Sequence, residues 1–162
     1  MKMTVLYYSK TGNTKHMAEI IADGMETVSG VESKTFSIDN IDDEWVNQSK
    51  CIVLGSPIYM ANICPGIAEF LDGPCMKYEL AGKIGGAFAT ADYIHGGGEL
   101  GIQFILNNML VAGMLTYSGG GSCGKPVIHI GPVAIKDKLD ESKETFFVYG
   151  QRMAAKAMEI YK

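Results

Sequence analysis

The sequence has no cluster of basic residues and no apolar run long enough to cross a bilayer. Its formal net charge is −4, which argues against nucleic acid or an anionic membrane as a partner. The longest apolar stretch, from Gly101 to Leu115, is interrupted by Gln103, Asn107 and Asn108 and is too short and too polar for a transmembrane helix. The chain opens directly into an apolar strand, without the basic and apolar regions of a signal peptide. We therefore expect a cytoplasmic protein.

Cysteine is scarce and dispersed. The sequence contains four cysteines and no Cys-x-x-Cys pair: Cys51, Cys64, Cys75 and Cys123. This pattern favours reduced thiols over a disulfide framework or a structural zinc site. The cysteines also lack the compact spacing that an iron–sulfur cluster requires. We therefore expect no metal site.

What the sequence does contain is a large apolar fraction arranged in alternating strand and helix patterns. Its 162 residues are 47% hydrophobic and 20% charged, which predicts one domain, residues 1–162, with a sizeable core. Alternating strands and helices favour an α/β fold with a parallel sheet and helices on both faces. We expect strands over residues 3–7, 32–38, 51–54, 84–90 and 114–117, and a continuation of the last strand, or a further strand, over 127–130. We expect helices after residue 14, over 63–71 and 100–112, and over 141–161, the last with Phe147, Met153, Ala154, Ala157 and Ile160 directed inward.

The segment from Tyr8 to Thr14 joins the first predicted strand to the first predicted helix. A loop in this position directs backbone amides and the positive end of the helix dipole toward one point, which suits a phosphate group. Ser9, Thr11 and Thr14 add hydroxyl groups that can bind phosphate oxygens. The Walker A pattern is absent, which disfavours ATP hydrolysis.

Two further loops are predicted at the same edge of the sheet. They span residues 55–62 and 90–99, after the third and fourth strands. In sheets of this kind, ligands bind beyond the carboxyl ends of the strands, at the point where the strand order reverses. Both loops are long and carry a tyrosine, Tyr59 or Tyr93. Together they suit a flat aromatic ring with polar edges.

These loops resemble those of a known family. Residues 9–14, Ser-Lys-Thr-Gly-Asn-Thr, are similar to the FMN-phosphate loop of flavodoxins, (S/T)-x-T-G-x-T. Residues 55–59 and 69–72 resemble the G-(S/T)-P-x-Y…FLD segment of flavodoxin-fold NAD(P)H oxidoreductases, and residues 95–99 resemble their H-G-G-x-E stretch. The resemblance covers nearly the whole chain. It implies a flavodoxin-like three-layer sandwich, a five-stranded parallel sheet in the order 2-1-3-4-5, and noncovalently bound FMN.

The resemblance also implies a set of cofactor-binding residues. At the phosphate it suggests Ser9, Thr11, Gly12, Asn13 and Thr14. Along the ring it suggests Pro57, Ile58, Tyr59 and Met60 on one side, and Thr90, Ala91, Asp92, Tyr93 and Gly96 on the other. Electron or hydride transfer to a flavin needs no side-chain acid or base, so no catalytic residue is assigned. Tyr59 and His95 are the candidates, and His95 has the alternative role of ordering its glycine-rich loop.

Three functions are compatible with these features. The first is an FMN-dependent oxidoreductase that takes electrons from NAD(P)H or a reduced partner and passes them to a small acceptor, which residues 95–99 and the long second loop favour. The second is a flavodoxin-type one-electron carrier that docks to protein partners, and the third is a flavin-free scaffold or sensor. WrbA-type quinone reductases carry a histidine pair where this chain has Val111 and Ala112, which argues against quinone reduction. A homodimer is compatible with the sequence.

Overall fold

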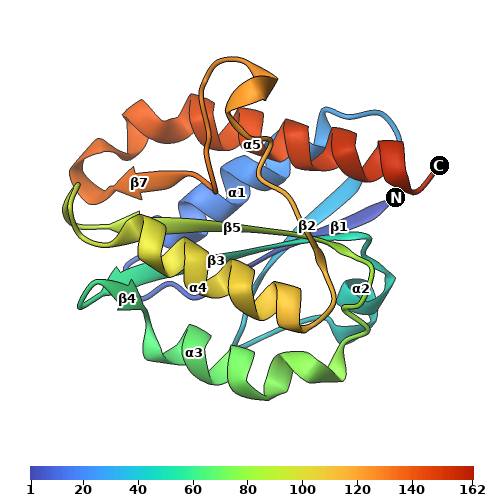
Figure 1. Ribbon diagram of the computed structural model, residues 1–162, viewed down its shortest axis with the longest axis horizontal. Helices are drawn as coiled ribbons and strands as arrows, with labels where there is room; N and C mark the ends of the chain where they lie inside the picture. Colours follow the sequence, from blue (N-terminus) through green and yellow to red (C-terminus); the bar gives the residue numbers. More distant parts are fainter.

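A parallel β-sheet forms the middle layer of the protein (Figure 1). The computed structural model describes the whole chain, Met1–Lys162. The sheet is built from β1 (Lys2–Tyr7), β2 (Glu32–Ser37), β3 (Cys51–Tyr59), β5 (Ile84–Ala91), β6 (Leu115–Thr116) and β7 (Val133–Ile135), and the short β4 (Asn62–Ile63) pairs antiparallel with the end of β3. The strand order is β2-β1-β3-β5-β6, with β7 also paired to β5. This confirms the predicted α/β fold and strand order.

Two short strands share the fifth position of the sheet. β6 pairs with the amino end of β5, where Leu115 lies beside Ile84. β7 pairs with its carboxyl end, where Ile135 lies beside Ala91. The residues between them form a loop that contains the short helix η2 (Gly121–Cys123). The fifth strand is therefore interrupted and returns to the sheet only at the end where the predicted ligand loops lie.

Helices cover both faces of the sheet. α1 (Asn13–Glu26) and α5 (Leu139–Ile160) lie on one face, and α3 (Pro65–Asp72) and α4 (Gly98–Val111) lie on the other (Figure 1). Shorter helices are α2 (Asp43–Gln48), η1 (Pro74–Lys77) and η3 (Lys136–Lys138). Side chains alternate along each strand, so Val5 and Val53 join the core under α1 and α5, whereas Leu6 and Leu54 join the core under α3 and α4. No helix is both long enough and apolar enough to span a membrane.

Two sequence expectations about the C-terminal third were wrong. Residues 127–130 are not a strand, because the chain pairs with β5 again only from Val133; within this loop Ile128 is buried in the core, whereas Val127 is 56% exposed. The closing helix begins at Leu139, and Phe147 and Ile160 are not its buried side chains. Phe146 and Tyr149 are buried instead. Together with Met153, Ala154 and Ala157, which were predicted correctly, they form the stripe of spacing three and four that faces α1 and the sheet.

Candidate functional site

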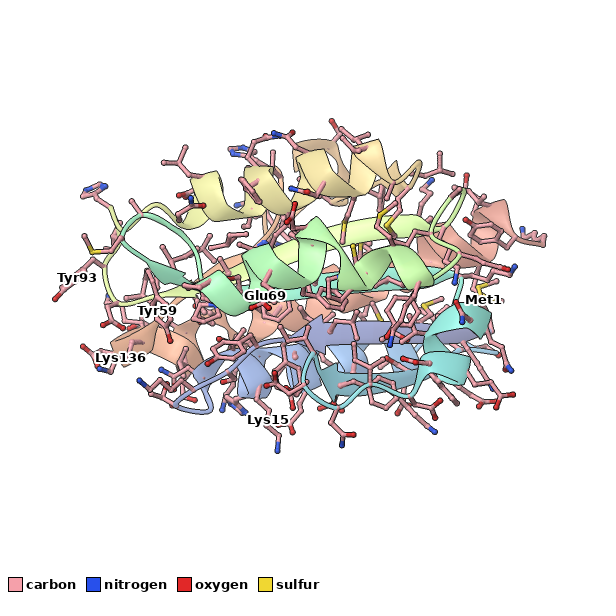
Figure 2. The ribbon with its side chains drawn as sticks, turned by 90° about the horizontal axis from the view of Figure 1, so that it is seen from below. Met1, Lys15, Tyr59, Glu69, Tyr93 and Lys136 are labelled. Carbon is pink, nitrogen blue, oxygen red and sulfur yellow. The ribbon has the colours of Figure 1, made fainter.

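A cleft of about 770 Å³ opens beyond the carboxyl ends of β1, β3 and β5. This volume falls within the range typical of small-molecule sites, about 300–1,000 Å³. Figure 2 shows Tyr59, Tyr93 and Lys136 together at this end of the molecule. The cleft is lined by Lys10, Thr11, Asn13, Thr14, Pro57, Ile58, Tyr59, Met60, Ala61, Thr90, Ala91, Asp92, Tyr93, His95, Gly96 and Lys136.

The structure therefore brings the predicted ligand residues around one space, with the exception of Ser9 and Gly12. These two residues shape the first loop. The Gly12 N–H donates to Ser9 Oγ at 3.1 Å, and Gly12 has a φ of 94°, which glycine adopts without steric cost. Their contact holds the turn from which α1 starts.

The first loop presents the amino end of α1 to the cleft. The first N–H groups of a helix have no partner within the helix. Here no side chain caps them, and no acidic residue lies in the first turn. Thr14 is buried and shares a hydrogen bond of 2.8 Å with the hydroxyl of Thr90 at the end of β5. This end of the cleft is thus rich in donors, free of carboxylates and fixed to the sheet, and these properties suit an anion.

The second loop is shorter than the sequence indicated, because β3 continues to Tyr59. It then turns through Met60 and Ala61 into β4. Both turn residues have left-handed backbones, with φ of 53° and 60°. Two-residue hairpins of this kind favour Asn-Gly, since a left-handed conformation costs a residue with a side chain about 1–2 kcal/mol. The strained turn lies on the wall of the cleft.

The third loop packs directly on this turn. Gly97 has a φ of 90°, and a Cβ atom there would lie 2.8 Å from both the Cα and the carbonyl oxygen of Ala61. Such a distance is shorter than real Cβ contacts, so the absence of a side chain at Gly97 allows the two loops to touch. The loops after β3 and β5 therefore form neighbouring parts of one wall.

The two candidate catalytic side chains have no catalytic partners. Tyr59 is 41% exposed, and burial, followed by the proximity of Cys64, raises its pKa, so the phenol stays protonated at neutral pH. His95 is exposed. Neither side chain shares a hydrogen bond with a carboxylate that would orient it as an acid or base. The arrangement suits cofactor contact rather than proton transfer.

Lys136 is a lining residue that the sequence analysis missed. It directly follows β7, and Ala91 and Ile135 pair in the sheet. Asp92 and Lys136 are therefore the first residues after the ends of two neighbouring strands. Lys136 and Lys10 form no ion pair, and the cleft holds these two lysines against one aspartate. Its lining is thus more positive than the chain as a whole, whose net charge is −4.

Other features lie away from this cleft. Val111 and Ala112 lie at the far end of α4, about 20 Å from its start at 1.5 Å per residue. A histidine pair at these two positions would not face the cleft of its own chain. The presence of Val111 and Ala112 in place of histidines therefore does not affect the lining of the cleft. A second cavity of about 60 Å³ lies among core side chains near η1 and α4 and has no charged lining residue. No three metal-ligating side chains come together anywhere in the chain.

Comparisons with known proteins agree with this geometry. A family model described as a flavodoxin domain matches residues 4–91. A flavodoxin of Clostridium saccharobutylicum is 38% identical over 161 residues, which covers 99% of this chain and 100% of the relative. An NAD(P)H dehydrogenase (quinone) of Geotalea daltonii is 31% identical over 143 residues, covering 71% of this chain and 69% of the relative.

Solved structures extend the likeness to the whole fold. The structure of a flavodoxin from the domain Archaea superposes with a TM-score of 0.80 at 25% identity and covers 98% of this chain and 99% of that one. A flavodoxin, WrbA-like protein from Agrobacterium tumefaciens gives a TM-score of 0.81 at 23% identity, with 98% of each chain covered.

Proposed function

We propose that this chain, which belongs to the flavodoxin family, works as an electron carrier that docks to redox partner proteins at the mouth of its cleft. FMN is the cofactor of the family and of this chain. When bound, FMN supplies the redox chemistry, and the protein supplies binding, orientation and electrostatics.

The lining of the cleft fits FMN. The amino end of α1 lacks a capping side chain and an acidic residue, which suits a phosphate dianion. Tyr59, at the end of β3, and Tyr93, in the loop after β5, line the rest of the wall, which suits a flat ring. We propose that Thr11, Asn13, Thr14 and the backbone of the first loop hold the phosphate.

The ring would lie against the second and third loops. In this arrangement Tyr59 and Tyr93 cover it, Ser9 and Gly12 maintain the shape of the first loop, and Asp92 sets the charge at its edge. The ring-side residues would be Pro57, Ile58, Tyr59, Met60, Thr90, Ala91, Asp92, Tyr93 and Gly96. Asp92 opposes the gain of negative charge, whereas Lys136 favours it.

The exposed apolar rim of the cleft is the observation that carries the proposal of a carrier. Met60 is 98% exposed, Tyr93 is 76% exposed and Ile94 is 66% exposed. Large apolar side chains at the mouth of a site, with no lid over them, suit transient contact with a partner protein. The full-length similarity to a flavodoxin supports the same conclusion. The sequence motifs alone favoured the FMN-dependent oxidoreductase over the electron carrier, so this proposal reverses their order.

An NAD(P)H-dependent oxidoreductase is the second candidate. The quinone dehydrogenase relatives and the His95–Glu99 segment support it. In this function, NAD(P)H would be the donor and a small molecule the acceptor. Because FMN is the cofactor, the flavin-free scaffold is not retained.

Anaerobic potentiometric reduction of the FMN-loaded protein tests the choice. For a carrier we expect two well-separated one-electron steps, with an absorbance band that belongs to neither the oxidised nor the fully reduced form. We also expect NADH and NADPH oxidation with a quinone panel to be no faster than with free FMN. A single two-electron step together with rapid turnover of either nucleotide would reject the carrier and support the oxidoreductase.

A further inference from the structure

The small cavity near η1 lies on the face of the sheet that α3 and α4 cover (Figure 1). We call it the α4 cavity. Its wall comes from β1, β3, α2, α3, η1 and the end of α4, its volume is about 60 Å³, and no charged residue lines it. It shares no lining residue with the cleft. The α4 cavity is therefore a separate space with a different chemical character.

The α4 cavity has a route to the solvent. Two of its lining residues lie at the surface, where Met76 is 63% exposed and Val111 is 87% exposed. A surface hollow of about 350 Å³ adjoins it, and the two spaces share Met76, Tyr78, Leu80 and Ala112. A small molecule can therefore enter when surface side chains such as Met76 move, without opening of the core.

The polar groups around the α4 cavity already have partners. Cys75, Tyr78 and Asn108 are the lining residues whose side chains carry a donor, and they donate hydrogen bonds within the protein at 3.3, 2.6 and 2.9 Å, respectively. The one buried side-chain nitrogen or oxygen without a partner belongs to Arg152, which does not line this cavity. A buried water needs two to four polar partners. The α4 cavity does not supply them, so it favours a nonpolar occupant over water.

Methionine side chains and the small volume define what the α4 cavity can hold. Met76, Met109 and Met114 all line it, and the flexible, polarizable thioether adapts to the shape of a nonpolar molecule. An apolar cavity of about 150 Å³ holds benzene, and one molecule of liquid water takes about 30 Å³. A space of about 60 Å³ therefore suits one large atom or a molecule of about two or three heavy atoms.

We infer that the α4 cavity is a binding site for a small nonpolar molecule, of the class of dissolved gases and short hydrocarbons. Such a ligand leaves water and gains contacts with wall atoms that face empty space in its absence. A ligand with hydrogen-bonding groups would lose its bonds to water without replacement, which costs free energy. The site is independent of the FMN cleft, so this inference does not depend on how the flavin is used.

Methyl NMR of the FMN-loaded full chain under xenon pressure tests this inference, with xenon as the probe. We expect saturable shifts of the Met109 and Met114 methyl signals, which belong to the cavity wall. The methyl signals of Met17 and Met25, which are buried under α1 and α5 on the other face of the sheet, should not move. Benzene, which is too large for the cavity, should leave all four signals unchanged.

Two substitutions change the size of the α4 cavity, and FMN absorbance and far-UV circular dichroism report whether each variant is folded. Ala112→Leu adds three carbon atoms to its wall and should weaken xenon binding about tenfold or more. The same change at Ala155, which is exposed on α5, should have no effect. Leu71→Ala enlarges the cavity and should admit benzene.

Three results overturn the inference. The first is the absence of saturable xenon shifts at Met109 and Met114, and the second is an equal response at Met17 and Met25. The third is equal xenon affinity in the folded Ala112→Leu and Ala155→Leu variants. If Ala112→Leu does not fold, Leu71→Ala decides, because failure of this larger cavity to bind benzene also overturns the inference.

Discussion

The contact between Gly97 and Ala61 gives the sharpest test of how the cleft is built. Gly97→Ala adds one methyl group to a residue with a φ of 90°, and this methyl group would lie 2.8 Å from two backbone atoms of Ala61. Backbone atoms cannot move aside as the end of a flexible side chain can. The substitution must therefore either displace the turn after β3 or strain both loops.

The magnitude follows from two effects. Placing alanine in the left-handed region costs about 1–2 kcal/mol. Overpacking against a fixed neighbour costs about 1–3 kcal/mol more. We therefore expect Gly97→Ala to lower the free energy of unfolding of the FMN-free protein by about 2–5 kcal/mol, the sum of these two effects.

Gly82→Ala is the matched control. Gly82 has a φ of 79°, and a Cβ atom there would meet nothing within 4 Å. This substitution should cost only the backbone effect, about 1–2 kcal/mol. The difference between the two variants then measures the contact with Ala61.

Urea denaturation of the FMN-free variants measures these stabilities without the contribution of ligand binding. Flavin fluorescence titration measures the second consequence. Displacement of the turn should weaken FMN binding by about tenfold in Gly97→Ala, equivalent to about 1.4 kcal/mol, and should leave it unchanged in Gly82→Ala. Equal destabilisation by the two substitutions, with equal FMN affinity, would refute the reasoning.

Four further predictions concern the turn after β3, the charge of the cleft and, in two cases, the thiols. Ala61→Gly should raise the free energy of unfolding in urea by about 1 kcal/mol, because it relieves a left-handed alanine; an unchanged or lower value would contradict the strain. Lys136→Gln should weaken FMN binding about three- to tenfold at low salt and less at high salt, whereas Lys15→Gln, outside the cleft, should not; equal effects would reject a local role for Lys136. Burial raises the pKa of Cys51 from its ordinary value near 9 to about 12, so the folded state keeps its proton while the unfolded state loses it. The free energy of unfolding should then fall as the pH rises from 9 toward 12, by at most about 1.4 kcal/mol per pH unit for this group, and less steeply in Cys51→Ala. In the native protein at pH 8, a thiol reagent should label the exposed Cys123 and not Cys51.

The sequence by itself determined the fold class and the edge of the sheet at which the ligand loops lie, and its resemblance to flavodoxins implied the strand order and most of the residues that line the cleft. The fold class and the loop positions depend on local patterns: continuous apolar runs for buried strands, and a hydroxyl-rich loop between a strand and a helix. The resemblance to flavodoxins in three loops then indicated FMN. Thr14 and Tyr59 could be placed at the cleft because each belongs to a segment, residues 8–14 or 55–62, that follows a strand predicted from the sequence pattern.

Only the tertiary structure decided the remainder, because it depends on contacts between segments distant in the sequence. Lys136 reaches the cleft because Ile135 pairs with Ala91, and β7 has only three residues, too few for a pattern to reveal. The close approach of Gly97 to Ala61 depends on how two loops pack. Likewise, the sequence shows that α4 is apolar. Which of its side chains remain exposed after one face has packed on the sheet is set by the fold.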